Sequence, residues 1–148
     1  MTHRILIADD NQANRELLEA YLSDVECEVR TAADGQETLD LVSSFQPDLI
    51  LLDIMMPKRS GFEVCSQVKN DATTNHIMIL MVTALNERGD IERAVDSGTD
   101  DFLSKPIERI ELLQRVKNML ELKGVRDENE RLRQYIQRME DTPPDALD

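Results

Sequence analysis

Residues 49–57 read LILLDIMMP, and this stretch decides the fold. Four consecutive apolar residues, 49–52, are typical of a strand that is buried on both faces of a parallel sheet. Asp53 follows at once, so its carboxylate is expected at the carboxyl end of that strand. Open α/β sheets bind their ligands at this edge. The stretch therefore predicts an α/β domain with a site at Asp53.

Other apolar runs also end in polar residues. In chain order, ILIA ends at Asp9-Asp10, IMILMV ends at Thr83, and FLS ends at Lys105-Pro106. Parallel strands share one carboxyl edge, so these side chains are expected to lie close to Asp53.

Segments with helical periodicity alternate with the apolar runs, which predicts βα units. Asn11 or Asn14 can cap the first helix, and residues 27–32 read as a strand. The helix that follows is expected to stop before Pro47.

A later helix is predicted over residues 87–97, with Ile91, Ala94 and Val95 turned inward. Gly98 is a residue that commonly ends a helix.

Composition and net charge exclude some classes of function for this chain. The formal net charge of −13 on 148 residues argues against nonspecific binding to nucleic acid or to an anionic membrane. The chain shows neither a long apolar run nor a signal peptide, and we expect one cytoplasmic domain. Cys27 and Cys65 are far apart in sequence, so we expect reduced, packed thiols.

The ordered set Asp9-Asp10, Asp53, Thr83 and Lys105-Pro106 resembles the receiver domain of two-component response regulators, over roughly residues 3–121. The resemblance implies a flavodoxin-like, doubly wound five-stranded parallel sheet of order 2-1-3-4-5 with five helices. It also implies that Asp53 accepts a phosphoryl group from a sensor histidine kinase or a phosphotransfer protein, and that the Lys105-Pro106 bond is cis.

Three carboxylates that converge at one edge repel one another, and a divalent cation can relieve this repulsion. Mg²⁺ binds through one or two carboxylates and keeps several waters. We expect Asp10 and Asp53 as direct ligands, Asp9 acting through a water, and a backbone carbonyl near Met55.

The residue chemistry supports phosphoryl transfer. Asp53 is the expected nucleophile, while Lys105 and Thr83 can stabilise charge on the transferred group. Each residue also has a structural interpretation: Asp9-Asp10 can cap a helix, Thr83 can be a strand-end hydroxyl, and Lys105 can belong to a turn. Their joint occurrence favours the functional interpretation.

By resemblance, we expect Phe102 to be an aromatic switch that responds to Thr83, and a core phenylalanine is the structural alternative. The same resemblance implies that the positions two after Asp53 and two after Thr83 control the approach of water to the phosphoryl group, and here they are Met55 and Leu85. Both are apolar, so slow self-dephosphorylation is expected.

The last helix is predicted to outrun the domain. Leu113, Val116 and Leu120 can face the sheet, and a second stripe then repeats with heptad spacing. Its members are Leu122, Val125, Asn129, Leu132, Ile136 and Met139.

This stripe predicts a parallel two-stranded coiled coil and a homodimer. A solvated amphipathic helix is the alternative, and a break at Gly124 with a new cap at Asp127 and Glu130 is another. We expect a receiver over 1–121, a helical extension over 122–141 and a disordered tail over 142–148.

Rival functions are less well supported. A phosphohydrolase of the haloacid dehalogenase pattern needs a second Asp where Met55 stands, so we expect no enzyme beyond self-phosphorylation and slow dephosphorylation. The helix after residue 121 can be the stalk of a longer regulator, such as a diguanylate cyclase. One acidic helix is not a DNA-binding module.

Overall fold

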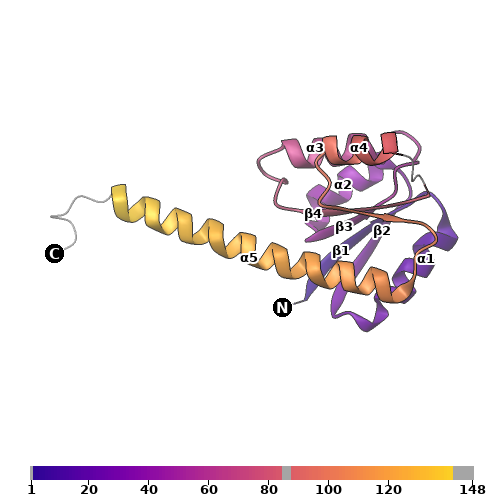
Figure 1. Ribbon diagram of the computed structural model, residues 1–148, viewed down its shortest axis with the longest axis horizontal. Helices are drawn as coiled ribbons and strands as arrows, with labels where there is room; N and C mark the ends of the chain where they lie inside the picture. The colour runs from indigo at the N-terminus through magenta and orange to yellow at the C-terminus, as the bar shows by residue number, and fades with distance from the viewer. Residues whose placement is uncertain (1, 85–87, 142–148) are drawn as a thin grey trace.

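A five-stranded parallel sheet forms the centre of the computed structural model, which describes residues 2–84 and 88–141 (Figure 1). The strand order is β2-β1-β3-β4-β5, which confirms the order 2-1-3-4-5. The strands are β1 (His3–Ala8), β2 (Cys27–Ala32), β3 (Leu49–Leu52), β4 (Met78–Thr83) and β5 (Asp101–Ser104).

Helices cover both faces of the sheet, as the resemblance implied. They are α1 (Gln12–Tyr21) with a short 3-10 turn η1 (Leu22–Asp24), α2 (Gly35–Phe45), α3 (Gly61–Asn70), α4 (Arg88–Asp96) and α5 (Arg109–Asp141). Figure 1 shows α2, α3 and α4 on one side of the sheet and α1 and α5 on the other.

Alternation along the strands explains why two cores form. Leu6 of β1 packs into the core under α2, α3 and α4, whereas Ile5 and Ile7 pack into the core under α1 and α5. Because both faces of β1 and β3 are covered, their runs are apolar at every position.

Local chemistry sets the helix ends. Asn11 is the cap of α1, since its side chain accepts from the Asn14 backbone N–H at 3.1 Å. Helix α2 ends at Phe45, one residue before Gln46, which adopts a left-handed conformation ahead of Pro47. Gly98 follows α4 with φ +95°, as expected of a residue that ends a helix.

The predicted inward face of α4 was wrong in part. Ala94 is buried, but Ile91 is 42% exposed and Val95 is 65% exposed. The buried ridge instead joins Ala94 to Ser97, three residues on, and Ile91 with Val95 forms the neighbouring ridge. Glu87, the predicted start of this helix, lies outside the described residues.

Helix α5 is one continuous helix of 33 residues that passes through Gly124 (Figure 1). The continuous helix is therefore confirmed, and a break with a new cap at Asp127 is not found. Val116 and Leu120 are buried against the sheet and Leu113 is partly buried. Residues 142–148, predicted to be a disordered tail, lie outside the described residues.

The apolar residues of the heptad stripe are exposed in the single chain: Leu122, Val125, Leu132, Ile136 and Met139. Within residues 2–84 and 88–141, no helix combines the length and the apolar character that a membrane span needs.

Candidate functional site

The predicted site residues meet at the carboxyl edge of the sheet. Asp9 follows β1, Asp53 follows β3, Thr83 ends β4 and Lys105 follows β5. Backbone hydrogen bonds extend the strand pairing into this edge: Asp53 N–H donates to Ala8 O at 2.9 Å, and Lys105 N–H donates to Thr83 O at 2.7 Å. The strands therefore position the backbone of each site residue.

Lys105 joins the two buried carboxylates. Its Nζ lies 3.0 Å from Asp9 Oδ2 and 3.4 Å from Asp53 Oδ2. Asp9 is 2% exposed and Asp53 is 7% exposed, so an ammonium group between them offsets part of the cost of burying two charges. The Lys105-Pro106 peptide bond is cis, as the resemblance implied.

Asp10 completes an acidic cluster. One carboxylate oxygen from each of Asp9, Asp10 and Asp53 lies within 4.8 Å of the others, and Asp10 is exposed at the mouth of the cluster. Hard oxygen donors at this spacing, open to water on one side, fit a divalent cation such as Mg²⁺. Met55 lies beside them, with its N–H donating to Asp53 Oδ1 at 3.4 Å and its side chain exposed.

Burial and charge act on Asp53 in opposite directions. Burial raises the pKa of the Asp53 carboxyl above its ordinary value, and the nearby Asp9 charge raises it further, while Lys105 lowers it. Burial alone lowers the pKa of Lys105, but contacts with Asp9 and Asp53 outweigh it and raise that pKa. A positive charge is therefore firmly held beside the Asp53 carboxylate.

Thr83 lies on β4, which pairs with β3, and Phe102 lies on β5, the next strand of the sheet. Thr83 is buried at the end of β4, opposite Ser104 in the register of β4 and β5. Phe102 pairs with Met81 in the same register and packs, partly buried, against the core under α3 and α4. Leu85, the second residue expected to control water access, lies outside the described residues.

Two glycines shape the loops around the site through contacts that the sequence pattern does not show. A Cβ at Gly61 would overlap the backbone of Asp53 and Ile54, and a Cβ at Gly35 would overlap Arg59. Gly61 N–H donates to Ile54 O at 2.8 Å, so the loop after Asp53 folds back tightly on itself. Glycine spacing after Pro57 was the available signal, but the partner of each glycine is distant in sequence.

A basic residue of this loop, Lys58, makes a contact that the sequence did not predict. Lys58 has φ +68° and its Nζ lies 3.4 Å from Asp34 Oδ2. Asp34 caps α2 by accepting from the Glu37 N–H at 2.8 Å. The cap of α2 is thereby tied to the loop that follows Asp53.

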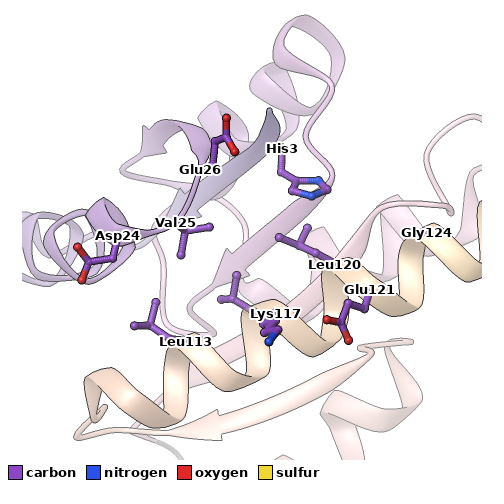
Figure 2. Close-up of a pocket in the computed structure, with 10 residues that line it drawn as sticks. His3, Asp24, Val25, Glu26, Leu113, Lys117, Leu120, Glu121 and Gly124 are labelled. Carbon is purple, nitrogen blue, oxygen red and sulfur yellow. The ribbon is translucent and has the colours of Figure 1, made fainter. Parts of the chain in front are cut away.

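A cavity of about 670 Å³ lies elsewhere on the molecule, between the start of α5 and the connection from η1 to β2 (Figure 2). Val25, Leu113 and Leu120 give it apolar walls, and His3, Lys117 and Glu121 line its rim. None of the predicted site residues lines it.

The domain is of the flavodoxin-like α/β class with a receiver-type site. It combines a doubly wound parallel sheet with an acidic cluster that a lysine bridges at the carboxyl edge. The chain belongs to the response regulator receiver domain family, whose model matches residues 5–117. It is thus a domain of the kind found in two-component response regulators.

Particular relatives agree with this assignment. The chain is 47% identical over 128 residues to the response regulator PleD of Caulobacter vibrioides, covering 86% of this chain and 28% of that protein. It is 43% identical over 117 residues to RpaA of Synechocystis, named a DNA-binding dual master transcriptional regulator, covering 79% and 48%.

A solved structure agrees in fold. The CheY-like response regulator receiver domain protein of Methanospirillum hungatei matches with a TM-score of 0.80 at 25% identity, covering 85% of this chain and 99% of that one. The chain spans less than half the length of PleD and of RpaA, and nearly the full length of this single-domain match.

Proposed function

We propose that Asp53 accepts a phosphoryl group from a phosphohistidine of a sensor histidine kinase or a phosphotransfer protein. A carboxylate oxygen of Asp53 attacks phosphorus, the P–N bond breaks, and its electron pair leaves with the histidine nitrogen. Receiver domains are phosphoacceptor signalling domains as a family, so the proposal concerns which residue and which donor act in this chain.

One observation carries the proposal: the Lys105 ammonium group lies against both Asp53 and Asp9 at the carboxyl edge of the sheet. Lys105 is placed to leave Asp9 for an oxygen of the incoming phosphoryl group. Thr83, at the end of the neighbouring strand, offers a hydroxyl to the same group. Burial raises the pKa of Asp53, while Lys105 beside it favours the ionised carboxylate that can act as the nucleophile.

Asp9, Asp10 and Asp53 are the residues that we propose for Mg²⁺, with the carbonyl of Met55 as a further ligand. When bound, the ion supplies positive charge that offsets both the carboxylates and the phosphoryl oxygens. The acidic cluster supports this assignment because its three oxygens converge and one member is open to water.

The test is phosphorylation by a small donor. Acetyl phosphate with Mg²⁺ is expected to add one phosphoryl group to the wild-type chain, seen by intact mass, and Asp53→Asn is expected to abolish the gain. Asp40→Asn, on the exposed side of α2, is the matched control and should label normally. Labelling of Asp53→Asn at the wild-type rate would overturn the assignment.

The output that we propose is a change in protein contacts, made in the cytoplasm, with no enzymatic step beyond phosphorylation and slow dephosphorylation of Asp53. Direct contact with nucleic acid or a membrane is disfavoured by the net charge of −13. Thr83 and Phe102 are the proposed switch residues, since both border the site on β4 and β5.

The proposed partner of the helical extension is a second copy of this chain, in a parallel coiled coil. At 100° per residue, the stripe that contains Val125 and Leu132 lies on the side of α5 away from Lys123, which packs toward the sheet. A second helix can therefore lie along the stripe without meeting the domain. Residues 1–121 are then the receiver and 122–141 the dimerising extension.

A second candidate is that this chain is the receiver and stalk of a longer regulator, such as a diguanylate cyclase. It is supported by the 28% coverage of PleD and by a helix that continues well past the sheet. The reading frame beyond residue 148 tests it: an output domain in frame supports the candidate, and a stop codon there contradicts it.

A further inference from the structure

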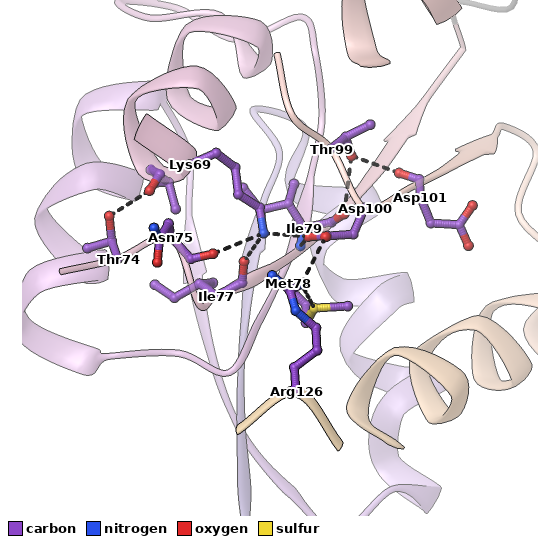
Figure 3. Close-up of polar contacts among 11 residues, drawn as sticks. Lys69, Thr74, Asn75, Ile77, Met78, Ile79, Thr99, Asp100, Asp101 and Arg126 are labelled. Carbon is purple, nitrogen blue, oxygen red and sulfur yellow. Dashed lines mark hydrogen bonds and ion pairs between the residues drawn. The ribbon is translucent and has the colours of Figure 1, made fainter. Parts of the chain in front are cut away.

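A second charged cluster lies at the opposite edge of the sheet from Asp53, and the proposed function does not use it (Figure 3). It contains Lys69 at the end of α3, Asp100 just before β5, Arg126 of α5, and a neighbouring pair, Asp48 before β3 with Lys123 of α5. We call these five residues the base clasp.

Asp100 is the centre of the clasp. One carboxylate oxygen accepts from the Ile79 N–H of β4 at 2.8 Å and lies 2.7 Å from Lys69 Nζ. The other oxygen lies 3.5 Å from a guanidinium nitrogen of Arg126. Figure 3 shows Lys69, Asp100 and Arg126 converging from three elements. One side chain therefore connects α3, the sheet and α5.

Lys69 is fixed independently of α5. Its Nζ also donates to Ile77 O at 2.6 Å and to Asn75 O at 3.4 Å, so the ammonium group is anchored on the connection between α3 and β4. Lys69 and Asp100 are both largely buried, whereas Arg126 is half exposed. Lys69 and Asp100 are thus the rigid members of the clasp, and Arg126 is its releasable member on the helix.

Lys123 forms the second link between α5 and the domain. Its buried ammonium group lies 3.8 Å from Asp48 Oδ1 and 2.7 Å from Asp127 Oδ2. Asp48 is held in turn, since its Oδ2 accepts from the Arg4 N–H at 2.8 Å. Lys123 and Arg126 flank Gly124, the position where the helix is intrinsically weakest.

The path of α5 connects the carboxyl edge of the sheet, where the site lies, with the base clasp at the amino edge. The helix begins at Arg109, close in sequence to Lys105 at the carboxyl edge, and leaves the domain at the amino edge beside Asp48 and Asp100 (Figure 1). Asp100 bonds to β4, the strand that ends in Thr83, and precedes β5, which carries Phe102. The clasp lies where these strands meet the outgoing helix.

We propose that the base clasp is a coupling device that holds the extension of α5 in one direction and rotational phase and passes rearrangements of β4 and β5 to it. The holding role needs only the contacts described above. The passing role rests on the proposed function, because it requires that phosphorylation at Asp53 alter β4 and β5.

Hydrogen exchange of the full chain tests the holding role. Arg126→Gln, and the double change with Lys123→Gln, are expected to speed exchange of backbone amides 122–130 by about two- to five-fold, the effect of losing partly exposed ion pairs. Arg131→Gln is the matched control, since Arg131 lies on the same helix and no ion pair to it is found among the described residues.

Light scattering of the same samples shows that the variants are compared in one oligomeric state. Asp100→Asn keeps an acceptor for the Ile79 N–H and removes only the charge, so it should resemble Arg126→Gln without unfolding the domain. Exchange of amides 122–130 that is equal in wild type, Arg126→Gln and the double variant would overturn the holding role.

Phosphorylation of the same variants tests the passing role. With acetyl phosphate and Mg²⁺, exchange of amides 122–130 should change at least two-fold in the wild type and not in Asp100→Asn, while intact mass shows equal phosphoryl gain in both. A phosphorylated wild type with unchanged exchange overturns the passing role and leaves the proposed function standing. Absence of phosphoryl gain overturns the proposed function and the passing role together, and leaves the holding role to the first experiment.

Discussion

At the scale of single residues, ionisation of Asp53 opposes folding, because the burial of its carboxylate outweighs the attraction of Lys105. Burial holds the pKa of its carboxyl above the ordinary value, so the folded state favours the protonated form. Ionisation of Asp53 near neutral pH therefore lowers the free energy of unfolding. That loss disappears at low pH, where the carboxyl is protonated in both the folded and the unfolded state.

Asp53→Asn is thus expected to be more stable than the wild type near pH 7 in chelator. The gain should shrink as pH falls through the raised pKa and vanish below the ordinary Asp value of about 3.9. Urea unfolding at several pH values measures it. Asp34→Asn serves as the opposite-sign control, because the Glu37 N–H and Lys58 lower the pKa of Asp34. An Asp53→Asn chain less stable than wild type at pH 7 would contradict the electrostatic account.

Mg²⁺ is expected to stabilise the unmodified fold through the same carboxylates. At a hundredfold excess over its dissociation constant the gain is about 2.7 kcal/mol. Asp10→Ala should raise stability in chelator and remove most of the response, because Asp10 is the exposed member of the cluster. Thermal melts with and without Mg²⁺ measure both effects, and one shared midpoint for the wild type would rule out the metal site.

The meeting of the proposed site residues was predictable because each stands at the end of an apolar run, and parallel strands bring those positions to one edge. The contacts of Lys58, Gly35 and Gly61 were not, since each depends on a loop whose path the sequence pattern does not define. Residues of the base clasp were missed for the same reason: Lys69, Asp100 and Arg126 meet only through tertiary structure.

At the scale of elements, the two faces of the sheet were easier to predict than the face of one helix. Fully apolar runs allow only a strand covered on both sides, whereas α4 has two adjacent ridges, and the more apolar one is not the one that is buried. The buried ridge carries the smaller residues, Ala94 and Ser97, while Ile91 and Val95 are exposed. The buried side of this helix is therefore marked by small side chains, and hydrophobic periodicity does not record side-chain size.

Glycine substitutions should separate tight packing from helix propensity. Gly61→Ala is expected to destabilise the domain by about 1–3 kcal/mol, because a Cβ would overlap the Asp53 backbone. Gly124→Ala is the control: its Cβ would meet nothing within 4 Å, and the change should stabilise α5 by about 1 kcal/mol. Chemical denaturation measures the first and helical circular dichroism the second. A neutral Gly61→Ala would show that the loop can move away from Asp53.

At the scale of the whole molecule, the exposed stripe on α5 predicts a dimer that depends on the extension. Light scattering should give a dimer for the full chain and a monomer for a chain that ends at Lys123. Asn129→Leu should make the assembly heterogeneous, since one buried Asn specifies a two-stranded state. A monomer in both chains would remove the coiled coil and leave a solvated helix.

The continuity of α5 through Gly124 has a mechanical consequence. Beyond Arg126, whose guanidinium group lies against Asp100 and Met78, the helix continues for about 22 Å at 1.5 Å per residue. A tilt of about 10° where it leaves the domain therefore moves its far end by roughly 4 Å, most of the rise of one helical turn. The contacts at Asp48 and Asp100 are the point about which the helix tilts. A tilt too small to alter the packing of the domain therefore becomes a large displacement at the far end of the helix.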